Sequence, residues 1–232
     1  MGIIGFREWR HREAGVFGRV DDSGGVSREI DVEVLPPAGG QGGGRWRQWQ
    51  APGCGMLLVW VVVAWGVEVA DVLLGGRLDG LGIWPRQMRG LPGVLLSPWL
   101  HGGFGHLMAN TMAFLGLGLL VLMAEGRRFV GTTLALVVVS GLGTWVIGRP
   151  GSVHIGASGL IYGYFGYLLG RAIWERKLGW AVLGVFVGVV YGGMIFGVMP
   201  GQGPISWEGH LAGLVAGLWL GWSHVKGKER SS

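Results

Sequence analysis

Apolar residues gather in six separate runs along the chain, divided by polar or glycine-rich stretches. Several runs approach the ~20 apolar residues that a helix needs to cross the hydrocarbon core of a bilayer. The pattern therefore predicts an all-α, polytopic membrane protein built as a bundle of six transmembrane helices. The runs lie near residues 56–74, 104–124, 130–148, 155–170, 179–198 and 209–225.

The composition agrees with a bundle in lipid. Hydrophobic residues make up 50% of the chain, charged residues only 14%, and the mean hydropathy is +0.45, which is too apolar for an ordinary soluble domain. The 49 glycines and 13 tryptophans suit closely packed helices with indoles at the membrane interface. The net charge of +5 comes from scattered basic residues that form no aromatic-interleaved patch, so we expect the lipid bilayer and no nucleic acid as a partner.

The first 50 residues differ from the rest. They hold seven arginines and seven acidic residues, show no sustained apolar periodicity, and reach a glycine-rich run at residues 38–44. We predict a flexible cytoplasmic tail over 1–50, a membrane domain over 54–226, and a short cytoplasmic tail over 227–232. A secretory signal peptide is not expected, because a long charged stretch precedes any apolar run.

The placement of Lys and Arg predicts the topology. Six crossings put both termini on one side of the membrane, and with cytoplasmic termini fifteen basic residues lie inside and four outside. Cytoplasmic segments are enriched in Lys and Arg, so this split predicts cytoplasmic termini in a bacterial plasma membrane. A long loop over about residues 75–103 then lies on the outer face, and loops of this length often carry function.

The fourth run opens on Gly156-Ala157-Ser158-Gly159, where small neighbours leave a hydroxyl accessible. By itself such a serine is more often a packing residue. From Ser158 to Gly170 the run holds 13 residues, or about 20 Å of helix, so against a core of ~30 Å the serine lies roughly 10 Å below the outer boundary. A helix that begins at that depth requires a protein-lined or wet cavity.

The sixth run opens on Gly209-His210, and an ionisable residue inside an apolar span is a functional candidate. The 16 residues to Val225 span about 24 Å, which puts His210 near the depth of Ser158. Glycines recur every four residues and let this helix lie tight against a neighbour. If that neighbour is the fourth helix, imidazole and hydroxyl come within hydrogen-bond reach. The alternative is a buried neutral histidine bonded to a carbonyl. The glycines are Gly209, Gly213, Gly217 and Gly221.

A third polar cluster precedes the second run, in His101-Gly102-Gly103-Phe104-Gly105-His106-Leu107-Met108-Ala109-Asn110. His106 and Asn110 share one helix face, where two side-chain donors could stabilise an oxyanion. The same face could instead cap a buried polar network. Zinc held by His101, His106 and His210 is a further alternative, but no Cys or carboxylate completes a familiar spacing. We therefore expect no metal and no cofactor.

The ordered motifs HGGFGHLMAN, GASGLIYGYFG and GHLAGLVAG resemble those of the rhomboid family of intramembrane serine proteases. The resemblance covers about residues 54–225. It implies that Ser158 is the nucleophile and His210 its base, without a carboxylate third member. It further implies an oxyanion hole of His106, Asn110 and the backbone N–H of Ser158. Gly156, Gly159 and Tyr162 would support the dyad, and Glu125 would have a structural role.

Two features depart from the common family pattern. Many rhomboids carry a Trp-Arg pair in the first outer loop, whereas this chain has Trp84-Pro85-Arg86, so no role is transferred to Arg86. This run, together with Ser206-Trp207-Glu208, is most similar to the actinobacterial branch. Glu208 could be proposed as a third triad member, but it lies two residues from His210, and a surface role is the expectation.

The resemblance implies that the substrates are transmembrane proteins. A transmembrane helix must unwind before cleavage, because its carbonyls are hydrogen-bonded and covered. Access between the second and fifth helices, with the Pro200–Pro204 loop as a lid, is the expectation. Two alternatives stay open: a catalytically silent scaffold that binds membrane clients, and a small-molecule transporter using its histidines as a relay.

Overall fold

The computed structural model describes residues 19–20, 26–27, 41–201 and 205–231. The chain divides into two compact units, Met1–Gly44 and Arg45–Ser232. In the first unit, β1 (Arg19–Val20) pairs antiparallel with β2 (Val26–Ser27). Most of the predicted flexible tail, and residues 202–204 of the expected lid, lie outside the described residues.

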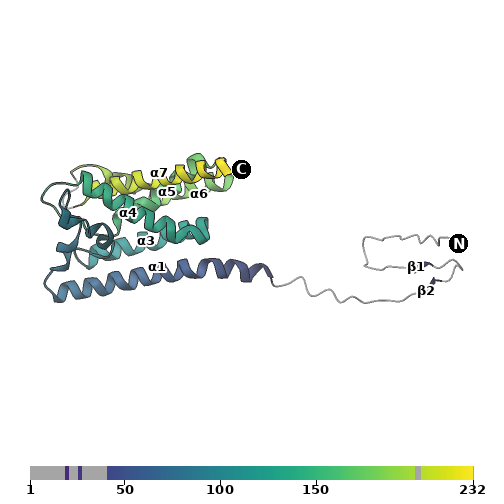
Figure 1. Cartoon of the computed structure of the whole chain (residues 1–232), viewed down its shortest axis with the longest axis horizontal. Coiled ribbons are helices and arrows are strands. Elements are labelled where there is room, and N and C mark those ends of the chain that lie inside the picture. Colours follow the sequence, from purple (N-terminus) through teal and green to yellow (C-terminus); the bar gives the residue numbers. More distant parts are fainter. Residues whose placement is uncertain (1–18, 21–25, 28–40, 202–204, 232) are drawn as a thin grey trace. The chain divides into compact units, whose positions relative to one another are not determined.

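The predicted all-α membrane bundle is confirmed. Six long helices occur in the described part of the chain, in the order of the six apolar runs (Figure 1). Three helical stretches there have the length and composition to span a bilayer, namely Gly53–Leu73, Phe104–Ile147 and Leu178–Val198. The helices are α1 (Gln41–Leu73), α3 (Phe104–Glu125), α4 (Phe129–Ile147), α5 (Ser158–Trp174), α6 (Leu178–Tyr191) and α7 (Trp207–Ser231).

Several helix ends differ from the apolar runs. Helix α1 begins at Gln41, inside the range predicted as a tail. Helix α7 continues to Ser231, and its last turn carries Lys228 and Arg230, which interact favourably with a helix C-terminus. The fifth run is divided, because α6 ends at Tyr191 and the chain continues as the 3₁₀ helix η5 (Gly192–Val198).

The loop over residues 75–103 folds into short helices and packs on the end of α4. Arg86, with φ +58°, donates from Nη1 to Val146 O at 2.7 Å. In return, Trp145 Nε1 donates to Gln87 O at 2.9 Å. The loop is thereby fixed where it leads into α3. Its elements are η1 (Leu78–Leu81), η2 (Met88–Gly90), α2 (Gly93–Leu96) and η3 (Ser97–Trp99).

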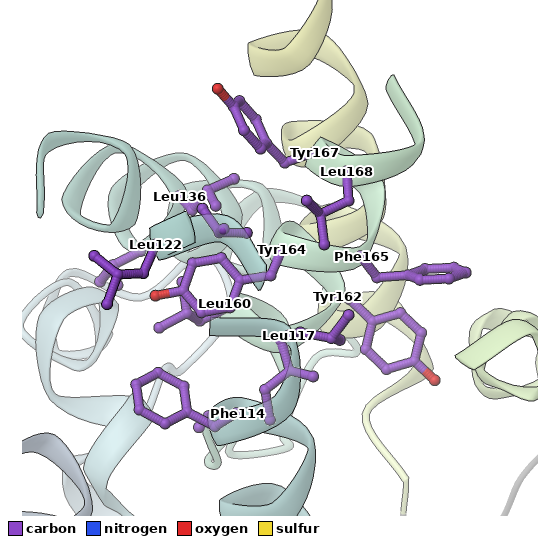
Figure 2. Packing of buried hydrophobic residues seen from close by; sticks show 14 of the residues in the cluster. Phe114, Leu117, Leu122, Leu136, Leu160, Tyr162, Tyr164, Phe165, Tyr167 and Leu168 are labelled. Atoms are coloured by element: carbon purple, nitrogen blue, oxygen red, sulfur yellow. The ribbon is translucent and has the colours of Figure 1, made fainter. Parts of the chain in front are cut away.

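Helix α5 is the central helix, with eleven of its 17 residues buried. Figure 2 shows its side chains meeting those of α3 and α4. Tyr164 lies 6.0 Å, ring to ring, from Phe114 of α3, and its hydroxyl bonds Thr133 of α4 at 2.8 Å. Contacts of buried side chains therefore fix α5 against α3 on one side and α4 on another.

Buried charges join the opposite end of α5 to its neighbours. Arg171 is only 2% exposed and forms ion pairs with Glu125 of α3 and Glu175, the latter at 2.9 Å. Tyr167 bonds both Arg171 Nη1, at 2.9 Å, and His224 of α7, at 2.8 Å. Buried charges are tolerated only when paired, so the structural role expected for Glu125 agrees with these contacts.

Helices α5 and α7 touch backbone to backbone, and Figure 1 shows them side by side. A Cβ on Gly213 would lie 2.1 Å from Gly159 O, and one on Gly217 would lie 2.1 Å from Gly163 O. No side chain fits at such distances, so the tight neighbour predicted for the glycine stripe is α5. The starts of the two helices consequently lie next to each other.

Candidate active site

Ser158 is the first residue of α5 and is partly exposed. The turn before it depends on Gly156, whose φ of +106° disfavours other residues. The Gly156 N–H donates to Ser97 O at 2.9 Å, and a Cβ on Gly156 would lie 2.9 Å from His106 Nε2. The outer loop and α3 therefore shape the turn that presents the serine.

His210 lies in the first turn of α7 and is 9% exposed. Its ring stacks on Tyr162, with centroids 4.1 Å apart and planes 11° apart. Its Nδ1 lies 2.9 Å from Gly197 O. A carbonyl only accepts hydrogen bonds, so Nδ1 carries the proton and Nε2 keeps a free lone pair, as a general base requires.

The starts of α5 and α7 bring Ser158 and His210 into one region. A Cβ on Gly159 would lie 3.6 Å from Gly209 O, so the residues next to the two candidates are in contact. Within residues 53–201 and 205–230, no hydrogen bond joins the Ser158 hydroxyl to His210. Such bonds are often long before substrate binds, and the dyad stays a prediction.

Helix η5 contacts both the phenol ring of Tyr162 and the imidazole ring of His210. The Tyr162 hydroxyl donates to Met194 O at 2.8 Å, and Gly197 lies against both Tyr162 and His210. The expected support of His210 by Tyr162 agrees with these contacts. The part played by the Gly197 carbonyl was not predicted, because a backbone acceptor has no signal in a residue pattern.

His106 and Asn110 lie together beside the turn before Ser158. Asn110 Nδ2 donates to His106 Nε2 at 3.0 Å and keeps a second N–H. A Cβ on Gly156 would lie 3.2 Å from Asn110 Nδ2. The N–H of Ser158, at the first position of a helix, has no helical acceptor. These groups lie beside the turn before Ser158, but His106 Nε2 is an acceptor here rather than the predicted donor. The oxyanion hole stays a prediction, with Asn110 and the Ser158 N–H as its available donors.

His101 supports the same turn. It accepts a long hydrogen bond from the Ala157 N–H at 3.5 Å, and its ring lies 5.1 Å from that of His106. The described residues contain no group of three His, Cys, Asp or Glu side chains that could hold a metal. The zinc alternative therefore has no support in this part of the chain.

A cavity of about 30 Å³ lies beside Ser158. Its volume suits about one water molecule. Several hydroxyl groups and one imidazole face it, so a bound water would find hydrogen-bond partners there. Its polar lining consists of Ser97, Ser140, Thr144, His154, Ser158 and Ser206.

The surface role expected for Glu208 is wrong. The residue is 1% exposed, and its Oε1 lies 2.8 Å from Nε of Arg149. Its ion-pair partner comes from the loop before α5, distant in the chain, which local sequence cannot reveal. A triad role is also disfavoured, because the Nδ1–H of His210, which a triad carboxylate would accept, donates instead to Gly197 O.

His154 and Ser206 are further polar residues that the sequence analysis missed. His154 Nδ1 lies 2.5 Å from Ser206 Oγ, and His154 Nε2 lies 3.0 Å from Ser152 Oγ. Burial lowers the pKa of His154, while the Glu208 carboxylate acts in the opposite direction. The imidazole is therefore neutral at pH 7. Its only signal in the sequence is its position four residues before Ser158.

Comparisons with known proteins agree with the architecture. The family model described as "Rhomboid domain" matches residues 89–227. The "Uncharacterized protein Rv1337" of Mycobacterium tuberculosis is 47% identical over 171 residues, covering 70% of this chain and 71% of the relative. The "Putative rhomboid protease YdcA" of Bacillus subtilis is 32% identical over 145 residues, covering 59% of this chain and 69% of the relative. "RHOMBOID-like protein 5" of Arabidopsis thaliana is 31% identical over 133 residues, covering 53% of this chain and 40% of the relative. The chain belongs to the rhomboid family.

Proposed function

We propose that this protein is an intramembrane serine endopeptidase in which Ser158 is the nucleophile and His210 the general base. The observation that carries the proposal is the Nδ1 contact of His210 with Gly197 O, which leaves Nε2 unprotonated on a residue whose helix start adjoins that of α5. A base whose second nitrogen is held by a third group is what activates a serine. Here a backbone carbonyl takes the place that a carboxylate has in a triad.

In the first half-reaction, the Ser158 hydroxyl attacks the scissile carbonyl carbon and its proton passes to His210 Nε2. The carbonyl oxygen becomes an oxyanion that receives hydrogen bonds from Asn110 and the Ser158 N–H. When the intermediate collapses, the C–N bond breaks and His210 donates its proton to the departing amine. Ser158 is left as an ester of the N-terminal fragment.

In the second half-reaction, a water molecule attacks the ester carbonyl while His210 takes its proton. The acid product then leaves as the proton returns to Ser158 Oγ. The polar cavity beside Ser158 can supply this water, because it has the volume of about one water and hydroxyl groups to hold it. Hydrolysis can thus proceed at a site within a membrane.

The substrates that fit this site are transmembrane segments of other proteins. Their helices must unwind locally before the serine reaches a carbonyl, since a helical carbonyl is bonded to the i+4 N–H. The distribution of Lys and Arg, fifteen against four, supports cytoplasmic termini in a bacterial plasma membrane. The site would then open toward the outer face.

The proposal is tested with purified full-length protein in detergent and in liposomes. We expect cleavage of a single-pass substrate and covalent labelling of the protein by a fluorophosphonate probe, with mass spectrometry placing the adduct on Ser158. If the protein binds transmembrane peptides yet neither cleaves nor labels, the scaffold alternative replaces the protease.

Replacing Asn110 with alanine removes a side-chain donor to the oxyanion. We expect kcat for substrate cleavage to fall about 100- to 1000-fold, with KM changed little, because the donor acts on charge that develops only in the transition state. The control is Thr111→Ala on the next residue, whose hydroxyl accepts from Trp65 Nε1 at 3.2 Å. Equal losses in the two variants would contradict an oxyanion role.

Access between α3 and α6 is supported by the sparse packing of α6, of which only Val187 is buried. Tyr191 lies over Gly116 of α3, where a Cβ would come 2.1 Å from its hydroxyl. Tyr191→Ala removes this contact, so we expect severalfold faster cleavage of a transmembrane substrate in liposomes and unchanged fluorophosphonate labelling. Val189→Ala, at an 80% exposed position of α6, is the control. An equal rise in both variants, or none in Tyr191→Ala, would argue against this route.

A further inference from the structure

Two pairs of polar side chains join the loop before Ser158 to the first turn of α7, which carries His210. We propose that these two pairs, which we call the polar clamp, position His210 relative to Ser158 and thereby set the rate of the serine's reaction. The catalytic consequence rests on the proposed function, whereas the structural link between the two segments does not. The polar clamp consists of Arg149 and His154 on the loop and Ser206 and Glu208 at the start of α7.

The charged pair has a buried member. Arg149 Nε lies 2.8 Å from Glu208 Oε1, and Arg149 Nη2 also donates to Ile205 O at 3.3 Å. Glu208 is 1% exposed, and within the described residues no well-aligned hydrogen bond reaches either carboxylate oxygen. The buried charge therefore depends on Arg149 and on the α7 N-terminus, so losing Arg149 leaves it poorly compensated.

The neutral pair acts on the helix cap. The Gly209 N–H donates to Ser206 Oγ at 3.3 Å, so Ser206 caps the first turn of α7. His154 Nδ1 holds the same hydroxyl at 2.5 Å. The backbone of His154 is itself paired with Ile83 in both directions at 2.9 Å. The cap is thus tied through His154 to the rigid outer loop.

The clamp lies close to both reacting groups along the chain. His154 is four residues before Ser158, and Glu208 is two residues before His210. A change in the separation of these segments consequently changes the separation of hydroxyl and imidazole. A shift of ~1 Å between reacting groups can cost about 100-fold in rate. Arg149, His154, Ser206 and Glu208 are therefore positioning residues.

The first test measures the rate of covalent labelling by the fluorophosphonate probe at several probe concentrations, which separates probe binding from the covalent step. The variants are Glu208→Gln, Arg149→Gln, the double variant and Arg149→Lys. We expect each glutamine variant to slow the covalent step about 10-fold with unchanged probe binding. The double variant should be no slower than either single variant, and Arg149→Lys should keep most of the rate. Glu229→Gln makes the same chemical change at an exposed position near the other end of α7 and should match the wild type. A Glu208→Gln rate within twofold of the wild type, or additive losses, would overturn the proposal.

A second test does not depend on activity. In the Ser158→Ala background, hydrogen exchange of the amides of residues 207–212 should be faster in Glu208→Gln and unchanged in Glu229→Gln. Unchanged exchange in Glu208→Gln would overturn the clamp even if the protein proves not to be a protease. Should Glu208→Gln fail to fold, Ser206→Ala and Ser206→Thr replace it. Threonine keeps the cap hydroxyl and should preserve the labelling rate, whereas equal losses in both would overturn the proposal.

Discussion

Ser158→Ala is expected to lower the rate of substrate cleavage by about 10⁴-fold or more and to abolish fluorophosphonate labelling. Alanine has no hydroxyl to form the acyl-enzyme, so only catalysis by the oxyanion donors and by substrate positioning would remain. His210→Ala should cause a similar loss, and the double variant should lose little more than either single one, because the two groups act as a unit. Initial rates on a single-pass substrate, with equal amounts of folded protein, provide the measurement.

Ser223→Ala is the matched control, because it makes the same change on α7 at a hydroxyl whose hydrogen bond among the described residues stays within its own helix, to Trp219 O at 2.8 Å. It should cleave at the wild-type rate. Persistent cleavage by Ser158→Ala would identify a different nucleophile. Full activity of His210→Ala would mean that the Nδ1 contact with Gly197 O serves packing and leaves the Nε2 lone pair without a catalytic part.

The positions of the helices and the close packing of α7 against a neighbour could be predicted from the sequence, because both depend on the spacing of residues. The six apolar runs predicted the six long helices in order, because an apolar segment in lipid must satisfy its backbone polar groups internally, as a helix does. The four-residue repeat from Gly209 to Gly221 predicted a tight neighbour, because a glycine face lets another backbone approach. The lengths of the two runs placed Ser158 and His210 at similar depths, with contact expected if the neighbour was the fourth helix, and in the structure the starts of α5 and α7 adjoin.

The parts that sequence did not predict depend on groups distant in the chain. Glu208 was expected at the surface because a charged residue in a first helical turn is ordinarily exposed, but it is buried and the α4–α5 loop supplies its partner Arg149. The orienting acceptor for His210 is a main-chain carbonyl, and every residue has one. The end of α6 at Tyr191 was also missed, since the apolar run continues into η5 without a change in composition.

Gly217→Ala is expected to cost about 3 kcal/mol or more of unfolding free energy, the largest stability effect we predict. The new Cβ would lie 2.1 Å from Gly163 O and 2.6 Å from Tyr167 N, both main-chain atoms of α5. No rotamer change relieves such an overlap, so α7 must move away from α5. Because the buried polar contacts of His210 and Tyr167 join the same two helices to their surroundings, the separation would also disturb groups that need partners.

Thermal unfolding in detergent, followed by circular dichroism, measures this effect, and Gly188→Ala on α6 is the matched control. Among the described residues, a Cβ on Gly188 meets no atom beyond its own helical turn within 4 Å. The same substitution there should leave stability unchanged or raise it slightly, since alanine favours helix more than glycine does. Equal stability of Gly217→Ala and the wild type would show that α7 can shift without loss. In that case the distance between Ser158 and His210 would be adjustable, and cleavage by this variant would fall while its fold persisted. A loss of both stability and activity in Gly217→Ala alone would show that the backbone contact of α5 with α7 holds the two helices, and with them the reacting groups, in register.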